Sequence, residues 1–386
     1  MDEQTVPKTF KYKLQPTAEQ ERAMAFVLRR CCELYNAALE ERTLAWERRR
    51  VSVTLAQQSA QLPEIKEVRP EYRDLHSQVL QDVLARLDRA YQTFFRRVKA
   101  GQKAGHPRYR GRGRYASFTY KQFGNGAQLD NGFLVLSKIG RLPVRWSRPL
   151  EGLPKTVTIT READGWYVSF SCMDVPIQSL PPTGQETGID LGLESFATLA
   201  DGSQIINPRI FRVAEVRLKR AQRCVSRRKK GSHRRRKAVV LLARAHQHVR
   251  RQRHDFQHQT ALTLVRAYDT IYHEALQTAN MVRNHALAKS ISDAGWGQFS
   301  TILAFKAACA GKRVEVVNPA FTSQACSGCG IIVQKGLSVR WHTCPACGTS
   351  LHRDQNAALN ILRLGQKSGA GQAPQALTQP VGVHVA

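Results

Sequence analysis

The chain has 386 residues, of which 59 are lysine or arginine and 30 are aspartate or glutamate, so its formal net charge is +29. It contains no run of 18 apolar residues and begins with an acidic segment, so we expect neither a membrane-spanning helix nor a signal peptide. So large a positive charge indicates a polyanionic partner, and nucleic acid fits better than a membrane.

The first half of the chain is predicted to hold a strand, two helices and a β-hairpin. Alternating apolar and basic residues predict a strand over 10–14, and Thr17 begins a capping-box sequence for the next helix. Apolar residues recur at helical spacing over 24–39 and over 75–97, which predicts two amphipathic helices, the second with Phe95 on its buried face. Alternation on both sides of Asp164-Gly165 predicts the hairpin. We expect the first strand to join this hairpin in a small barrel, with the helices as an insertion.

The second half is predicted to form a separate domain after the proline-rich segment 176–183. Its predicted elements are a β-hairpin over 187–202, helices over 209–267, a strand over 270–274, a helix over 292–310, a strand over 314–317 and a last helix from 354 to about 364. Strands followed by alternating helices and strands indicate an α/β domain with a mixed sheet.

Two cysteine pairs give the strongest chemical signal. Both have two residues between the cysteines and a glycine after the second, and 14 residues separate the pairs. Two thiolates on one tight turn can occupy adjacent corners of a tetrahedron. Because four sulfurs fill all four corners, we expect a structural Zn²⁺ without an open position. The predicted ligands are Cys326, Cys329, Cys344 and Cys347.

A basic block and three acidic residues complete the signals. Residues 209–253 contain 18 lysines or arginines and a single acid, Glu215, which predicts a track for phosphate backbones. Asp190 lies within a predicted strand, Glu274 ends another, and Asp354 begins the last helix. Each could have an ordinary structural role, but three such acids in a basic protein suit a two-metal site.

Several motifs, taken in this order, resemble the TnpB family, the transposon-encoded relatives of type V CRISPR effectors. The motifs are YKLQPTAEQ, FFRRVKAGQKAGHPRYRGR, GIDLGLESFATLADG, ISDAGWGQFSTILAFKAACAG, FTSQACSGCG, CPACG and RDQNAALNIL. The resemblance implies an α+β multidomain protein: an RNase H-like (RuvC) α/β domain with an inserted zinc ribbon, and a β-barrel wedge domain carrying a helical recognition insert.

The resemblance also implies domain boundaries. It places the wedge domain at 1–16 and 105–180, the recognition insert at 17–104, the RuvC domain at 181–325 and 349–366, the zinc ribbon at 326–348 and a flexible tail at 367–386.

The function implied is that of an RNA-guided DNA endonuclease which cuts duplex DNA beside a short transposon-adjacent motif. The guide RNA would come from the transposon end, and the RNA complex would hold one protein chain, in the cytoplasm of a prokaryotic cell and associated with its nucleoid. By position, Asp190, Glu274 and Asp354 match the RuvC carboxylates that hold catalytic Mg²⁺ or Mn²⁺. His352 departs from the family pattern, because an acid usually stands two residues before the third carboxylate.

Candidate nucleic-acid contacts follow from the resemblance and from the basic segments. A helix resembling the one that faces the adjacent motif supplies polar residues, since glutamine can pair with adenine, and two basic regions supply phosphate contacts. The candidates are Ser77, Gln78, Gln81, Arg108, Arg110, Arg227, Arg228, Lys229, Lys230, Arg234, Arg235 and Arg236.

Three other functions are compatible with part of the sequence. A guided DNA-binding repressor without cleavage would need no complete set of acids, whereas all three are present. A strand-transfer transposase is less compatible with the order Asp, Glu, Asp and with a ribbon before the third acid. A plain zinc-ribbon RNA-binding protein leaves Asp190 in its strand without a role.

Overall fold

The chain folds into two compact units, Thr5–Pro176 and the residues from Ile177 onward. A computed structural model describes residues 5–111, 113–336 and 338–369. Each unit has a hydrophobic core of its own. Within the described part of the chain, no helix combines the length and apolar character needed to cross a membrane.

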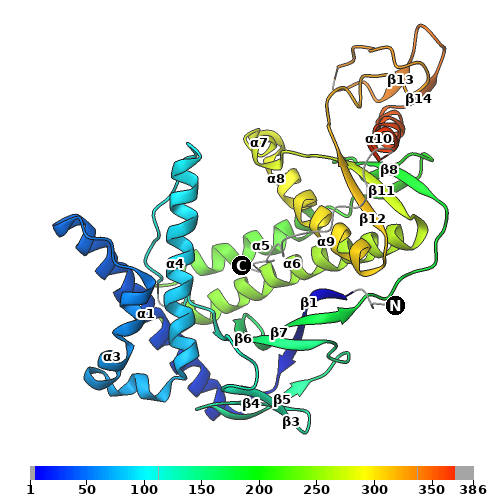
Figure 1. Cartoon of the computed structure of the whole chain (residues 1–386). Helices are drawn as coiled ribbons and strands as arrows, with labels where there is room; N and C mark the ends of the chain where they lie inside the picture. The colour runs from blue at the N-terminus through cyan, green and yellow to red at the C-terminus, as the bar shows by residue number, and fades with distance from the viewer. Residues whose placement is uncertain (1–4, 112, 337, 370–386) are drawn as a thin grey trace. The chain divides into compact units, whose positions relative to one another are not determined.

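The first unit is built on an antiparallel sheet of seven strands (Figure 1). The strands are β1 (Thr5–Leu14), β2 (Ser117–Tyr120), β3 (Ala127–Asp130), β4 (Phe133–Leu136), β5 (Gly140–Arg145), β6 (Leu153–Glu162) and β7 (Gly165–Pro176). Their order is β2-β6-β7-β1-β5-β4-β3. Among the described strands, β2 and β3 each pair on one side only, so the expected barrel is only partly closed.

Helices are inserted between β1 and β2, as the sequence predicts. They are α1 (Ala18–Arg49), α2 (Leu55–Ala60), α3 (Leu62–Val68), the 3-10 helix η1 (Pro70–Asp74) and α4 (Ser77–Lys99). The capping box at Thr17 is present, with the Thr17 side chain accepting from the Gln20 amide. One prediction is wrong: helical spacing places Phe95 on the buried face of α4, but its side chain is 54% exposed.

The second unit contains a mixed sheet of five strands in the order β10-β9-β8-β11-β12. The strands are β8 (Glu186–Asp190), β9 (Ser195–Leu199), β10 (Gln204–Ile206), β11 (Thr270–Glu274) and β12 (Arg313–Val317). The helices are α5 (Ile210–Ser226), α6 (His233–Ala267), α7 (Thr278–Met281), α8 (His285–Ala294), α9 (Trp296–Cys309) and α10 (Arg353–Gly369). A short hairpin of β13 (Trp341–Thr343) and β14 (Ser350–His352) precedes α10. The strands β8, β11 and β12 are parallel, and β9 and β10 are antiparallel, which confirms the predicted mixed sheet.

Two of the predicted helices differ from those in the structure. The single helix predicted over 292–310 is two helices, because Gly295 adopts a left-handed conformation with φ of +65° and ends α8. The last helix continues to Gly369, beyond its predicted end. The rest of the predicted tail, 370–386, lies outside the described residues.

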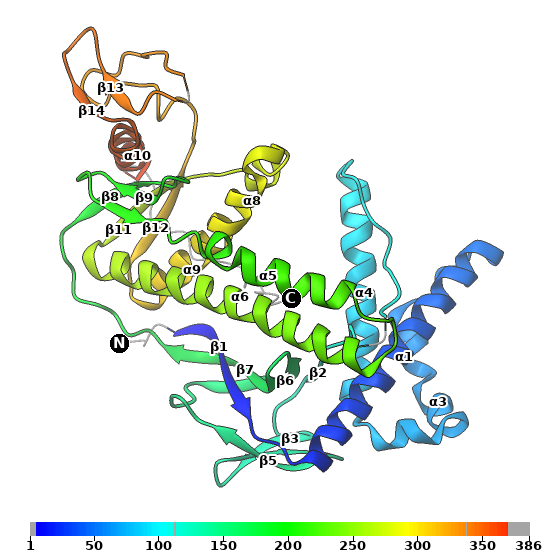
Figure 2. The same ribbon diagram turned by 180° about the vertical axis from the view of Figure 1, so that it is seen from behind.

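Helices cover both faces of this sheet (Figure 2). Ile271 belongs to the core formed with α6, α8 and α9. Tyr272, the next residue of β11, packs instead with Ile361 of α10. Because alternate side chains of a strand point to opposite faces, α10 covers one face and the other three helices cover the opposite face.

The helix α10 approaches β8 and β11 so closely that only glycine fits at two positions. A Cβ atom at Gly188 of β8 would lie 2.2 Å from the carbonyl oxygen of Ala358 in α10. A Cβ atom at Gly365 of α10 would lie 1.9 Å from the Tyr272 ring. The backbone of α10 therefore rests almost directly on the two strands.

We expect Gly188→Ala to destabilise the second unit. Overpacking of this kind costs about 1–3 kcal/mol, which corresponds to a fall in Tm of roughly 2–10 °C. Gly297→Ala is the matched control, because a Cβ atom there would meet only the Thr278 hydroxyl at an ordinary 4.0 Å. Thermal unfolding followed by circular dichroism measures both, and equal Tm values for the two variants would contradict the prediction.

Candidate functional site

Two of the three candidate acids end adjacent parallel strands. Ile189 of β8 lies opposite His273 of β11, and Asp190 and Glu274 are the next residues of the two strands. The ends of β8 and β11 therefore place these two carboxylates side by side at one edge of the sheet.

Both side chains point to the face that α10 covers. Asp190 lies two residues after Gly188, and Glu274 lies two residues after Tyr272, so each shares a face with the residue that contacts α10. Asp354 occupies the first turn of α10. The close approach of this helix therefore brings the third acid to the same edge.

The start of α10 is fixed by the residues around Asp354. The Arg353 amide donates to the carbonyl oxygen of Arg340 at 2.8 Å. The Asp354 amide donates to Nδ1 of His352 at 3.3 Å, so His352 satisfies one of the free amides of the first helical turn. Nδ1 of His352 also lies 3.9 Å from Oδ2 of Asp354. The residue that departs from the family pattern thus contacts the third acid.

Glu274 and Asp354 act electrostatically on Asp190. Burial raises the pKa of Asp190 to about 8, the charges of Glu274 and Asp354 add to this effect, and Arg353 opposes it. Burial also raises the pKa of Glu274, while a hydrogen bond donated by the Thr322 hydroxyl lowers it. A cluster of repelling carboxylates is an environment that divalent cations stabilise.

These carboxylates do not converge as tightly as the cysteine sulfurs. Within the described residues, the four cysteines are the one group of three or more His, Cys, Asp or Glu side chains placed to hold a single ion. The three acids lie at the same edge of the sheet, but their carboxylate oxygens are not close enough together to coordinate a single ion in this conformation.

Two buried asparagines of α10 were missed by sequence reasoning. Asn356 accepts from the Ser327 amide at 2.9 Å and donates to the carbonyl oxygen of Ala325 at 2.7 Å. Asn360 donates to the carbonyl oxygens of Ala325 and Thr322. These side chains tie the helix to the segment that also supplies the hydroxyl bonded to Glu274. Their spacing of four residues on one helical face was the available signal.

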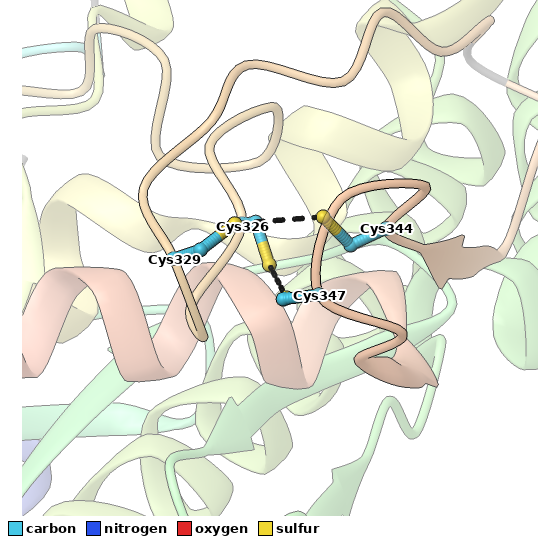
Figure 3. Close-up of side chains that lie close together, drawn as sticks. All are labelled: Cys326, Cys329, Cys344 and Cys347. Atoms are coloured by element: carbon cyan, nitrogen blue, oxygen red, sulfur yellow. Dashed lines mark hydrogen bonds between the residues drawn. The ribbon is translucent and has the colours of Figure 1, made fainter.

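The four cysteines come together between two loops (Figure 3). The Sγ atoms of Cys326 and Cys347 are 3.6 Å apart, those of Cys329 and Cys344 are 3.5 Å apart, and all four lie within 4.8 Å of one another. A tetrahedral ion with Zn–S bonds of about 2.3 Å needs sulfurs about 3.8 Å apart. The four thiols therefore match the donor set and spacing of a zinc site.

Local hydrogen bonds favour the thiolate form of Cys326 and Cys347, whereas the neighbouring thiols raise the pKa of Cys329. The Gly328 amide donates to Sγ of Cys326 at 3.3 Å. Hydrogen bonds from the side chain and backbone of Thr349 lower the pKa of Cys347 to about 6. Because the thiolate is the metal-binding form, these contacts prepare the cluster for a cation.

Most of the candidate phosphate contacts in the second unit are exposed. Arg227, Arg228, Lys229 and Lys230 lie between α5 and α6, and Arg234 and Arg236 lie in the first turn of α6. Arg235 is engaged instead, since its Nη1 donates to the carbonyl oxygens of Val225 and Arg228. It therefore caps the end of α5.

The candidates of the first unit also differ in accessibility. Ser77 and Gln81 are exposed near the start of α4, and Arg108 and Arg110 are exposed in the loop before β2. Gln78 is buried, and its Oε1 accepts from the Gln122 amide at 3.0 Å. In this conformation the Gln78 amide is occupied within the protein.

Family models match three stretches of the chain. Residues 169–285 match a family described as "Probable transposase" (OrfB of IS605), and residues 296–361 match "Cas12f1-like, TNB domain". Residues 1–50 match a "Helix-turn-helix domain" of OrfB, and the described residues of this region contain strand β1 and helix α1.

The chain is also similar to named proteins over most of its length. A Streptomyces pristinaespiralis protein named "Putative RNA-guided DNA endonuclease" is 39% identical over 95% of this chain and 91% of its own. A similarly named protein of Escherichia coli K12, InsQ, is 30% identical over 93% and 92% of the two chains. "TnpB-like protein L79" of Acanthamoeba polyphaga mimivirus is 28% identical over 57% of this chain and 45% of its own. The chain therefore belongs to the TnpB family.

Solved structures show the same fold at low sequence identity. The protein in a complex titled Cas12f1-sgRNA-target DNA superposes with a TM-score of 0.57 at 13% identity, covering 92% of this chain and 98% of that one. The mini-RNA-guided endonuclease Cas-phi3 gives a TM-score of 0.50 at 11% identity, covering 93% and 92% of the two chains. At these identities the likeness concerns the fold alone.

We expect the purified protein to contain one zinc ion and Cys344→Ser to lose it. Four thiolates supply much of the folding free energy of a module with so small a core, so the segment around the cluster should unfold locally. Elemental analysis and limited proteolysis measure the two effects. Cys224→Ser, on α5 and outside the cluster, should retain the metal. Soluble, active parent protein without zinc would contradict this prediction.

Proposed function

We propose that this protein is an RNA-guided DNA endonuclease of the RuvC type, which cuts duplex DNA beside a short transposon-adjacent motif. The observation that carries the proposal is the gathering of Asp190, Glu274 and Asp354 at one edge of the mixed sheet, under the first turn of α10. The sheet order, with three antiparallel strands followed by two parallel ones, supports an RNase H-like domain. The names of the full-length relatives support guided cleavage.

The same three carboxylates would hold the catalytic Mg²⁺ or Mn²⁺ ions. Carboxylate oxygens are the ligands that these cations prefer. When bound, such ions activate water and stabilise the leaving oxygen of a phosphodiester. The protein's own part is positional: Thr322 orients Glu274, and the docking of α10 sets the position of Asp354.

Separate parts of the chain would hold the guide RNA and the target DNA. The exposed cations between α5 and α6 suit the RNA backbone, and Ser77 and Gln81 suit base edges of the adjacent motif. Base pairing with a guide from the transposon end would supply sequence specificity. A zinc ion in the cysteine cluster would be structural, and one chain would form the RNA complex.

Asp190→Asn should abolish cleavage while leaving guide-directed DNA binding nearly unchanged. Loss of one carboxylate should slow cutting by more than about 100-fold, since even the outer partners of metal ligands contribute 10- to 100-fold. A gel-shift assay and a cleavage assay on one guided target, with Mg²⁺ or Mn²⁺, measure the two properties.

Glu194→Gln is the control for this experiment. Glu194 lies four residues after Asp190, and its exposed side chain pairs with Arg340 at 3.1 Å. Its replacement should change cleavage little. Undiminished cleavage by the Asp190 variant would mean that the site lies elsewhere, whereas a parent protein that binds the guided target without cutting would favour the repressor.

Neutralising Arg227, Arg228, Lys229 and Lys230 together should weaken RNA binding and its dependence on salt. Each lost contact to single-stranded phosphate lowers the slope of log affinity against log salt by roughly 0.7. Titrations at several salt concentrations measure this slope. An unchanged slope would show that these side chains face solvent in the RNA complex.

A further inference from the structure

The far end of α4 presents an exposed aromatic surface. Phe95 is 54% exposed, and Tyr109 in the following loop is 59% exposed. The helix extends away from the sheet of its unit, and the chain returns beside its end (Figures 1 and 2). We call the segment from Tyr91 to Lys99, together with His106–Arg110, the α4 tip. Large apolar side chains on so open a surface indicate a binding site.

The ring of Phe95 is held in place by its neighbours. It stacks on Tyr91 with a centroid separation of 6.2 Å and an interplanar angle of 28°, and it meets Phe94 at 5.2 Å. His106 packs edge-on against Tyr91 and Phe94 at 5.3 and 5.4 Å. An exposed ring that is already fixed loses little conformational entropy when a ligand covers it.

The loop that carries Tyr109 is also anchored. The Arg110 amide donates to the Asn36 side chain at 2.8 Å, and Asn36 donates back to the Arg110 carbonyl at 3.0 Å. His106, three residues before Tyr109 in this loop, packs against Tyr91 and Phe94, so the loop runs beside the ring cluster. Two exposed aromatic rings therefore lie in the same part of the first unit.

The charge around these rings has one sign. Residues 89–111 contain seven lysines or arginines and no acid. Arg89 pairs with Asp82 at 3.5 Å. Five further basic residues precede residue 109, and none of them has a carboxylate within ion-pair distance among the residues that the structure describes. They are Arg96, Arg97, Lys99, Lys103 and Arg108. The α4 tip thus offers unneutralised cations beside fixed, exposed rings.

We propose that the α4 tip stacks unpaired nucleobases on Phe95 and Tyr109 while Arg96, Arg97 and Lys99 contact the phosphates of the same strand. A ring beside cations is the arrangement by which proteins hold single strands, since every base has a face that can stack. An intact duplex hides those faces, and an acidic protein partner would have no need of flat rings. The strand could be part of the guide RNA or of the displaced DNA, and both present the same chemistry.

A fluorescent base inserted in a single strand tests this proposal directly. Full-length protein, freed of bound nucleic acid at high salt, is titrated with an RNA of about 12 nucleotides, within the usual range of site sizes, that contains 2-aminopurine, whose fluorescence is quenched by stacking. The parent should quench the probe. Phe95→Ala should lose this quenching and bind the strand roughly 5- to 100-fold more weakly at that site, whereas Phe95→Tyr should retain both. Quenching is the main readout because other basic surfaces also bind the strand.

Val98→Ala is the matched control, because Val98 lies on the same helix and is 51% exposed but has no ring. It should leave quenching unchanged. Arg97→Gln should lower the salt slope by roughly 0.7 and leave the quenching of bound probe intact. Undiminished quenching with Phe95→Ala, or an equal loss with Val98→Ala, would overturn the proposal.

Matching DNA and duplex probes identify the source of the strand. A duplex whose binding depends on Phe95 as strongly as that of the single strand would also overturn the proposal. Tighter binding of RNA than of DNA would assign the tip to the guide, and the reverse preference would assign it to the displaced DNA strand. The assay measures no cleavage, so its outcome is independent of the three acids. Asp190→Asn should quench the probe as the parent does.

Discussion

The contact of α10 with β8 and β11 determines the geometry of the second unit. The helix lies so close to the sheet that a single methyl group at Gly188 or Gly365 would overlap Ala358 or Tyr272. This distance decides whether Asp354 shares an edge with the acids at the two strand ends. The position of the three acids thus depends on the two glycines that allow α10 to approach the sheet.

The same contact sets the electrostatic state of the acids. Covering the strand ends with a helix removes water from Asp190, and the neighbouring acids raise its pKa further, to about 8. Full ionisation of the cluster is therefore unfavourable without a cation, and a bound divalent ion would offset the repulsion between the carboxylates. The buried asparagines of α10 keep this arrangement rigid, because each satisfies backbone groups that would otherwise be buried without partners.

Sequence reasoning succeeded where a pattern is long and failed where it depends on distant packing. The periodicity of α1 and α4 and the alternation of β6 and β7 predicted these elements, and the cysteine spacing predicted the cluster. The break at Gly295 was missed because both of its sides are helical. The burial of Phe95 was predicted wrongly because the apolar pattern of α4 continues beyond the end of the core against which the helix packs. Asn356, Asn360 and Gln78 resemble solvated polar residues until their partners, more than 25 positions away, are known.

The cysteine cluster has a consequence for chain entropy. Residues 318–352 connect β12 to α10, and ordering that connection costs entropy that increases with its length. An ion that binds both Cys326 and Cys347 joins two points far apart in this connection. Fewer residues then remain to be ordered when α10 docks on the sheet. The metal would then favour the docked helix, and with it the position of Asp354, without touching any of the three acids. Zinc bound at the cysteine cluster would in this way stabilise the arrangement of the three acids only by lowering the entropy cost of docking α10.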